Sequence, residues 1–194
     1  MDLKIRTALT CDIPHLAYIW LEATAGVIEA LYEGAIPGRQ TNEIVEHIFS
    51  RSGTTTCFSN AIIAEEGDAV VGGLHAYPEA EEAHDPSDPL VEEGRLNVLK
   101  PFSELHATGS YYIVAVTLYP EARNKGIAKR LLQRAESNAK GQGFEQISLH
   151  VFEQNGVARS LYLRRGYQEE ACRPVVAHPR IRYGGNILLM TKSL

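Results

Sequence analysis

A short basic turn at residues 119–132, with the sequence YPEARNKGIAKRLL, carries the residue types best suited to bind an anion. Its four cations stand near the start of a predicted helix and are Arg123, Lys125, Lys129 and Arg130. Cations are normally favoured at the other end of a helix, where the dipole is negative. The first amides of a helix have no partners within it, so basic side chains beside them indicate a site for an anionic group. Gly126 allows a phosphate to approach the backbone, where a side chain would block it.

The same turn has a simpler interpretation, and two known phosphate-binding loops do not match it. A helix start with Pro120 in its first turn and a solvated basic face would have a similar sequence. A Walker loop requires G-x-x-x-x-G-K-[ST], but Gly126 is followed by Ile127. A dinucleotide fingerprint requires G-x-G-x-x-G directly after a strand, whereas GQGFEQ at 141–146 precedes a predicted strand. The turn alone therefore leaves both interpretations open.

A second motif, NGVARSLYLRRGY at 155–167, lies one predicted helix and one predicted strand further along the chain. Together the two segments resemble the GNAT superfamily of acyl-CoA-dependent N-acyltransferases. For the family's R/Q-x-x-G-x-G/A pyrophosphate loop, the corresponding residues are Arg123, Asn124, Lys125, Gly126, Ile127 and Ala128. For its N-x-x-A-x-x-L-Y-x-x-x-G-F/Y motif, they are Asn155, Ala158, Leu161, Tyr162, Gly166 and Tyr167. The resemblance covers most of the chain, and it departs at Ala128, where glycine is commoner.

The resemblance implies a single N-acetyltransferase domain over residues 1–194, with a poorly matching acidic insertion at about 78–108. The expected fold class is mixed α/β (α+β), with flanking helices around a mixed, mostly antiparallel sheet. Strands 111–118 and 146–152 are expected to form a central parallel pair that splays apart. Independently of the resemblance, the strand–helix–strand order of the second half predicts a right-handed crossover and a locally parallel pair.

The remaining elements follow from hydrophobic periodicity and turn residues. Apolar residues at helical spacing predict one helix over 13–32 and another over 42–51. Two apolar runs around Gly67 predict a β-hairpin. Thr10 or Asp12 is expected to cap the first helix, and Thr41 the second.

The resemblance also implies that acetyl-CoA is the cosubstrate, wedged between the splayed strands with its pyrophosphate on the amides of 124–128. The pantetheine arm would pair with exposed main chain near Val116 and Leu118, as an added strand would. The residues expected to bind acetyl-CoA are Val116, Leu118, Arg123, Asn124, Lys125, Gly126, Ile127, Ala128, Lys129, Asn155 and Tyr162. Asn155 would hold the pantetheine amide or simply cap the helix that follows it.

Transfer in this family is direct, so the acceptor amine attacks the thioester without an enzyme nucleophile. Tyr162 is the expected general acid for the departing thiolate, because a phenol with a reference pKa near ~10 is protonated at neutral pH. A tyrosine packed beside Leu161 on an amphipathic helix is the alternative. His150 or Glu153 is the expected general base, with His75 and Glu79 also considered. A water chain that delivers the proton to solvent is equally compatible with the sequence.

The acidic segment at 79–93 lies in the connection that would border the acceptor site. One interpretation is a lid that attracts a cationic primary amine, on a small molecule or a peptide. The other is a solvated loop whose charge serves solubility, which is the usual role of a charge run. A catalytically silent acetyl-CoA-binding sensor or interaction module is the alternative function, although the presence of both Asn155 and Tyr162 argues against lost catalysis.

Composition excludes several other classes of protein. A net charge of −5 is unlike that of a general nucleic-acid binder. The longest apolar stretch, YYIVAVTLY, is too short to cross a bilayer, and the first residues contain no signal-peptide core. The three cysteines are widely spaced and indicate free thiols in a reducing compartment. No two histidines form an H-x-H or H-x-x-x-H pair, so we expect no metal. We expect a cytoplasmic monomer or homodimer without membrane or nucleic-acid partners.

Overall fold

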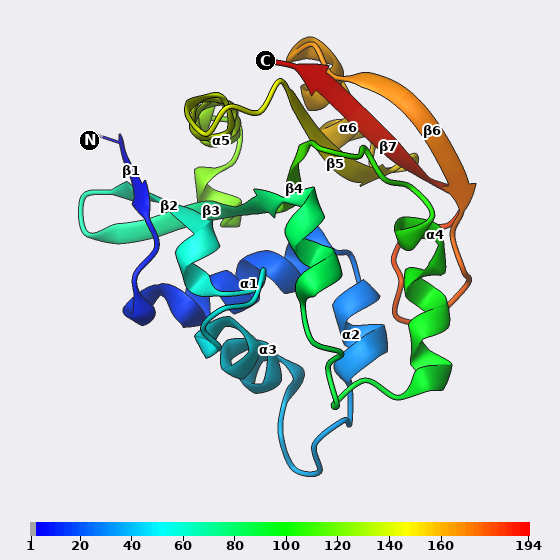
Figure 1. The fold of residues 1–194 in the computed structure, drawn as a ribbon. Helices are drawn as coiled ribbons and strands as arrows, with labels where there is room; N and C mark the ends of the chain where they lie inside the picture. The colour runs from blue at the N-terminus through cyan, green and yellow to red at the C-terminus, as the bar shows by residue number, and fades with distance from the viewer. Residues whose placement is uncertain (1–2) are drawn as a thin grey trace.

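Seven strands form one mixed sheet in the computed structural model, which describes residues 3–194 (Figure 1). The strand order is β1-β2-β3-β4-β5-β7-β6. Only β4 and β5 run parallel, and every other neighbouring pair is antiparallel. The mixed, mostly antiparallel sheet predicted from the sequence is therefore confirmed. The strands are β1 (Leu3–Thr7), β2 (Ala61–Glu66), β3 (Ala69–Pro78), β4 (Tyr111–Leu118), β5 (Gln146–Phe152), β6 (Gln168–Pro174) and β7 (Asn186–Ser193).

Helices cover both faces of the sheet and bury a separate apolar cluster on each (Figure 1). One face packs against α1 (Ile13–Ala23), α2 (Val27–Tyr32) and α3 (Thr41–Ser50). The other face packs against α5 (Ile127–Gly141) and α6 (Gly156–Arg164). Successive residues of a strand point to opposite faces, which divides the apolar side chains of β2 between the two clusters.

The single helix predicted over 13–32 is wrong, because the chain breaks between α1 and α2. Ala25 and Gly26 both have positive φ, at 52° and 99°. A Cβ on Gly26 would lie 1.8 Å from the carbonyl oxygen of Arg180, and the Ala25 carbonyl accepts a hydrogen bond from the Arg182 amide at 2.9 Å. The close approach of this distant loop therefore requires glycine and a break in the helix.

The predicted helix caps agree with the structure only in part. Residues Thr10–Asp12 form a 3₁₀ turn before α1, and Asp12 is the N-cap residue of α1 as predicted, although its side chain makes no capping hydrogen bond to this helix. The N-cap of α3 is Gln40 rather than Thr41, and its amide donates to the Glu43 carboxylate at 2.8 Å.

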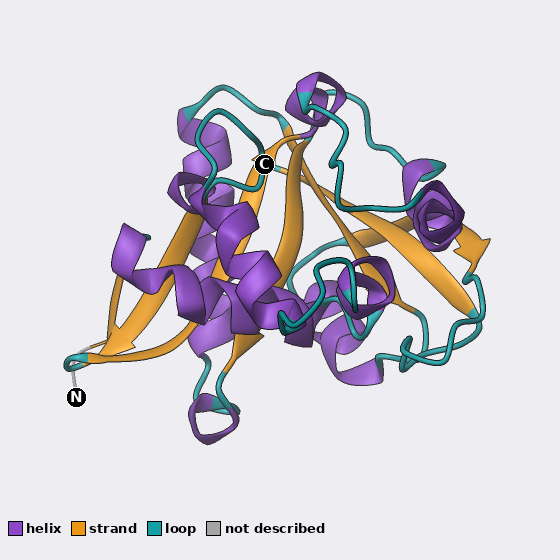
Figure 2. Ribbon diagram, turned by 90° about the horizontal axis from the view of Figure 1, so that it is seen from below, coloured by secondary structure: helices purple, strands orange, loops and turns teal. Residues whose placement is uncertain are grey.

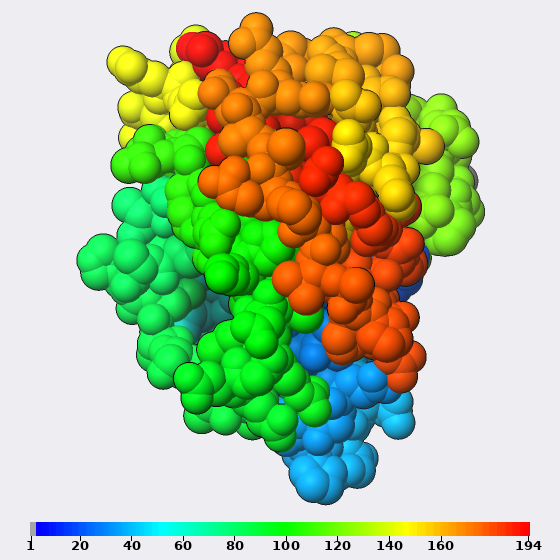
Figure 3. All heavy atoms as spheres, turned by 90° about the vertical axis from the view of Figure 1, so that its right-hand side faces the viewer, coloured from blue at the N-terminus to red at the C-terminus, as the bar shows by residue number. Residues whose placement is uncertain are grey.

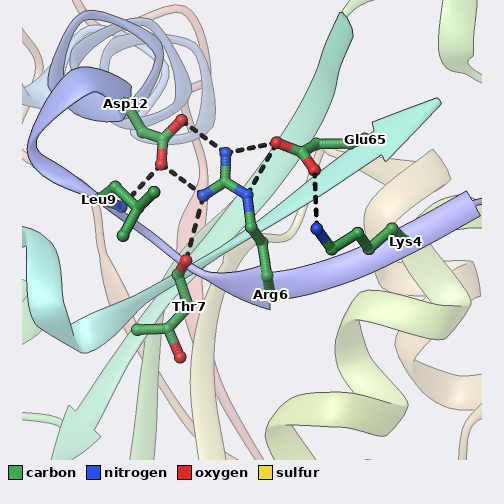
Figure 4. Close-up of polar contacts among 6 residues, drawn as sticks. All are labelled: Lys4, Arg6, Thr7, Leu9, Asp12 and Glu65. Carbon is green, nitrogen blue, oxygen red and sulfur yellow. Dashed lines mark hydrogen bonds and ion pairs between the residues drawn. The ribbon is translucent and has the colours of Figure 1, made fainter. Parts of the chain in front are cut away.

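Asp12 instead joins β1, β2 and the entry to α1 through a buried ionic network (Figure 4). Only 2% of Asp12 is exposed, and its carboxylate accepts from Arg6 Nη1 at 2.6 Å and from the Leu9 amide at 2.7 Å. Arg6 also donates from Nε to Glu65 at 2.7 Å. Burial alone would raise the pKa of Asp12, but the hydrogen bonds from Arg6 and Leu9 outweigh it and the pKa is lowered.

The parallel strands β4 and β5 separate soon after they begin, as Figure 2 shows in the diverging strands of the sheet. They pair only at Tyr111 with Ile147, Tyr112 with Ser148 and Ile113 with Leu149. Farther along, β4 stays paired with β3 and β5 with β7. The predicted splayed parallel pair is confirmed.

A β-bulge lies on β4 directly after its last pairing with β5. His75 of β3 pairs with Ala115 and Ala76 pairs with Ile113, which leaves Val114 as the extra residue. The bulge therefore occurs where β4 and β5 begin to separate.

The acidic insertion folds onto the face of the sheet that carries α1–α3. It contains 3₁₀ turns at Glu79–His84 and Glu93–Leu99, followed by the short helix α4 (Lys100–Ser103). Asp88 accepts hydrogen bonds from Tyr32 at 3.1 Å and Arg51 at 3.0 Å, so the insertion is held to α2 and the residue after α3. Figure 3 views the side of α4 and β6 and shows the green residues of the insertion beside the orange and red residues of the C-terminal strands.

Candidate functional site

The basic turn leaves the start of α5 open to a ligand. Gly126 precedes the helix in the left-handed region with φ 78°, and no side chain caps the helix. Asn124 also has a positive φ of 63°. A Cβ added at Gly126 would meet no heavy atom within 4 Å, so the glycine supplies backbone conformation and free space rather than close packing. Residues 123–126 are exposed, whereas Ile127 is buried and anchors the turn. The site therefore fits a phosphate group bound by backbone amides.

Two of the predicted cofactor-binding cations around this turn already have protein partners. Arg123 donates from Nε to the Leu118 carbonyl at 3.3 Å, which ties the turn to the end of β4. Lys125 Nζ lies 3.4 Å from a carboxylate oxygen of Glu66, and both side chains keep solvent contact. An exposed pair of this kind is weak, so Lys125 can turn toward an anion at little cost.

The second motif lies after β5, at the end of the sheet where the basic turn follows β4. Asn155 caps α6, because its side-chain oxygen accepts from the Ala158 amide at 3.2 Å. Tyr162 is buried in the cluster under α5 and α6, 5.7 Å from the ring of Tyr167. Burial raises the pKa of Tyr162, so its hydroxyl is protonated at neutral pH. Both motifs follow the carboxyl ends of the parallel strands, where ligands of such sheets commonly bind.

His150, one of the two expected bases, uses both ring nitrogens in hydrogen bonds. Nε2 lies 2.8 Å from the Leu105 carbonyl, which only accepts, so we assign the ring proton to Nε2. Nδ1 then accepts from the Tyr112 hydroxyl at 2.8 Å. Burial lowers the pKa of His150 to about 4. The ring is therefore neutral and links the insertion to the sheet.

The structure places the other candidate bases in three different surroundings. Glu153 is exposed after β5 and accepts from Asn186 at 2.8 Å. His75 is fully buried against Trp20 and Phe49, donates from Nε2 to the Thr55 carbonyl at 2.9 Å, and has a pKa lowered by burial to about 4. Of these three, only Glu79 lines the pocket between the insertion and the central strands.

This pocket has a volume of about 100 Å³ and borders the point where β4 and β5 separate. This volume is small compared with the ~300–1,000 Å³ of sites that enclose a drug-sized ligand. The pocket therefore suits the terminal group of an extended ligand rather than a whole molecule. Its apolar walls come mainly from 99–107. Its polar side chains are Glu79, Glu82, Ser103, His106, Tyr112, Ser148 and His150. Desolvation, followed by the nearby carboxylates Glu79 and Asp85, raises the pKa of Glu82, against the opposing effect of His106.

Sequence reasoning did not include His106 or Tyr112 among the site residues. His106 lies in the insertion within HATG, a sequence that matches neither motif. Tyr112 belongs to an apolar strand and reads as a core residue. Only the folding of the insertion onto the sheet brings these side chains together, so no local signal could have found them.

Neither a metal centre nor a membrane span was found in the part of the chain that the structure describes. Within residues 3–194, no group of three or more His, Cys, Asp or Glu side chains is arranged to hold a metal ion. Among the helices of the same residues, none has the length and apolar character needed to cross a membrane.

The fold and the site together define a class of protein. A central parallel pair that separates, beside an uncapped helix start in an anion-binding turn, is the arrangement expected of a GNAT-like acyltransferase. A family model described as "Acetyltransferase (GNAT) family" matches residues 28–167, which is more than half of the chain. The chain belongs to this family of acetyltransferases.

Individual similar proteins agree with this assignment. A stretch of 64 residues is 39% identical to the uncharacterized N-acetyltransferase YycN of Bacillus subtilis (strain 168). This stretch covers 33% of this chain and 41% of the relative. The match thus spans about two fifths of the length of the curated relative.

Three solved structures share the fold at low identity. An N-acetyltransferase from Staphylococcus aureus Mu50 is 17% identical, with a TM-score of 0.74 over 97% of this chain and 100% of its own. The polyamine N-acetyltransferase of Drosophila melanogaster is 16% identical, with a TM-score of 0.62 over the full length of both chains. The PaiA N-acetyltransferase of Thermoplasma acidophilum, solved with coenzyme A, is 18% identical, with a TM-score of 0.56 over the full length of both.

Proposed function

We propose that this protein transfers an acetyl group directly from acetyl-CoA to a primary amine on a small molecule or peptide. The observation that carries the proposal is the separation of β4 and β5 beside the open turn before α5. The carboxyl ends of both strands lead into the two sequence motifs, so one ligand can contact both. The solved neighbour that holds coenzyme A supports this choice of cosubstrate.

The pyrophosphate of acetyl-CoA would bind the amides of residues 124–128, with Arg123 and Lys129 adding positive charge. The pantetheine arm would lie along β4, next to Val116 and Leu118, on the side that β5 has left. The side-chain oxygen of Asn155 already bonds the Ala158 amide, so Asn155 would act toward the ligand through its NH₂ group or through the position of α6.

Much of the acceleration would come from holding the amine and the thioester in line. The bulge residue Val114 has no ladder partner on β3, so its amide is our choice to bond the developing oxyanion. Tyr162 would donate its proton to the departing CoA thiolate, which agrees with a pKa that burial raises.

The acceptor would be a cationic amine whose end enters the pocket beneath the insertion. Two carboxylates, Glu79 and Glu82, line this pocket together with apolar side chains, a combination that suits an alkylammonium group. The structural neighbour named as a polyamine N-acetyltransferase supports the same class of acceptor. The three free cysteines of the described chain support a reducing, cytoplasmic location.

The first experiment follows CoA thiol release from acetyl-CoA with a panel of polyamines, aminoglycosides, amino acids and basic peptides. We expect release with small cationic amines. Silence across the panel, with acetyl-CoA still protecting the protein from heat, would favour the alternative of a binding-only sensor.

Tyr162→Phe tests catalysis within the same assay. Loss of the acid should lower kcat by roughly 10²-fold or more, while the acetyl-CoA dissociation constant measured by calorimetry changes far less. Leu163→Ala, at an exposed neighbour on the same helix, is the matched control and should retain wild-type turnover. Equal turnover in Tyr162→Phe and wild type would remove Tyr162 from the mechanism.

A further inference from the structure

A histidine–carboxylate pair lies in the wall of the acceptor pocket. His106 Nδ1 is 3.2 Å from Glu79 Oε1, and both residues line the pocket. No hydrogen bond within residues 3–194 occupies Nε2 of His106. A carboxylate beside Nδ1 favours the tautomer with its proton on Nδ1, which leaves the Nε2 lone pair free to accept a proton.

The loop that carries His106 is fixed to the sheet at several points. The preceding residue, Leu105, accepts the bond from His150, and His150 in turn accepts from Tyr112. On the other side, the Gly109 amide lies 3.4 Å from the second carboxylate oxygen of Glu79. The Glu79 amide also donates to the Ser110 carbonyl at 3.0 Å. Both members of the pair are thus positioned by the residues just before β4 and by His150 of β5.

We propose that His106, oriented by Glu79, is the general base that deprotonates the acceptor ammonium. The inference deepens the proposed function and rests on it. His150 has no free nitrogen, His75 is sealed in the core, and Glu153 lies outside the pocket. His106 combines a place in the pocket with a free nitrogen and a side chain that is 43% exposed, so a proton taken from the substrate can pass to solvent.

The proton balance is complete with these residues. The ammonium gives one proton to Nε2 of His106, and the freed nitrogen lone pair attacks the thioester carbon to form the C–N bond. The C–S bond then breaks, and the thiolate takes the Tyr162 proton. The acetylated nitrogen loses a second proton to solvent, and solvent returns a proton to the Tyr162 phenolate. His106 releases its own proton to water, so each turnover yields an acetamide, CoA thiol and one proton.

Several charged or titratable groups surround the pair and take part in its behaviour. Glu82 faces the pair from the insertion, and Tyr112 and His150 face it from the two central strands. The carboxylates of Glu79 and Glu82 favour a cation in the pocket, so they attract the ammonium group of the acceptor. The neutral His150 adds no opposing charge at neutral pH.

The test compares His106→Gln and Glu79→Gln with wild type, using the amine of the panel that turns over fastest. His106→Gln should lower kcat/KM by about 10²-fold or more near neutral pH. It should also abolish the limb of the pH profile on which an imidazole loses its proton. Glu79→Gln should lower kcat/KM by a smaller factor, about tenfold, and imidazole added to His106→Ala should restore activity. His84→Gln, at an exposed histidine of the same insertion, is the matched control and should behave as wild type.

The outcomes separate the base from the overall function. If wild type acetylates an amine and His106→Gln keeps the same pH profile, the base assignment is wrong while the proposed function stands. If no amine is acetylated, the proposed function fails, and an NMR titration still examines the pocket. Addition of 1,4-diaminobutane should then shift the Cε1–Hε1 signal of His106 and leave that of His84 in place. Equal or absent shifts would overturn the placement of His106 against the amine.

Discussion

Single residues decide whether the basic turn can accept a phosphate. The geometry at Gly126 has two separate requirements, a positive φ of 78° and empty space where a side chain would begin. The motif alone predicts a glycine at this position. The structure adds that the glycine is not required by close packing, because a Cβ there would meet no heavy atom within 4 Å. The role of Gly126 is therefore conformational and ligand-directed, so a substitution there should affect binding more than packing.

Gly126→Asp should weaken acetyl-CoA binding by tenfold or more, because a carboxylate would stand where we place the pyrophosphate. The left-handed conformation also costs roughly 1 kcal/mol for a residue with a side chain. Gly67→Asp controls for that cost, since Gly67 has a similar φ of 65° and open surroundings in the β2–β3 hairpin. Calorimetry of acetyl-CoA binding checks both variants, and equal affinities for the two would contradict the placement of the pyrophosphate.

At the scale of elements, the central strands and both motifs follow from local signals, whereas the break in the first predicted helix depends on a distant segment. Both motifs and the strand pair at 111–118 and 146–152 are encoded in contiguous residues, and the structure contains these strands with the same bounds. The break between α1 and α2 is imposed by residues 180–182, far along the chain, so periodicity over 13–32 could not reveal it. His106 escaped notice for the same reason, because its partner Glu79 lies in a different part of the insertion.

The Asp12 network offers a test of how the first elements are joined. Asp12→Asn removes the charge that Arg6 and the Leu9 amide bond in a buried site, and should lower the free energy of unfolding by about 2–3 kcal/mol at pH 7. Because the folded-state pKa is lowered, this stabilisation is present above the unfolded value near ~3.9 and is lost as pH falls. The difference between variant and wild type should therefore shrink in acid.

Urea denaturation at several pH values measures this difference. Glu104→Gln is the control, since its ion pair with Arg173 is 44–45% exposed and should change stability by less than about 1 kcal/mol. A loss for Asp12→Asn no larger than that of the control would show that the network contributes little.

The whole molecule combines two apolar clusters with two neutral histidines, the buried His75 and the half-buried His150. His75 and His150 each have a pKa lowered by burial, from 6.5 to about 4. The unfolded chain binds protons at these positions below pH 6.5, whereas the folded chain does so only near pH 4. The contribution of these two histidines to the free energy of unfolding is therefore largest above pH 6.5, and it declines as pH falls toward 4.

The expected decline approaches about 2.7 kcal/mol per pH unit at its steepest, as two protons correspond to twice ~1.36 kcal/mol. Free energies of unfolding at pH 7, 6 and 5 measure it. His150→Gln should reduce the slope by one proton, even if the variant is less stable overall at every pH. A slope that the substitution leaves unchanged would mean that His150 titrates normally in the folded protein.

The position of β7 between β5 and β6 has a consequence for the protein while it is being made. Residues 186–193 form the strand that joins the outer strand β6 to the rest of the sheet. A nascent chain that already contains both motifs and β6, but not yet residues 186–193, leaves β6 without a neighbour and one edge of β5 unpaired. Long-range pairings of this kind form late. Synthesis must therefore pass residue 193 before all seven strands can pair. Until then the unpaired edges of β5 and β6 are available to chaperones or to other chains.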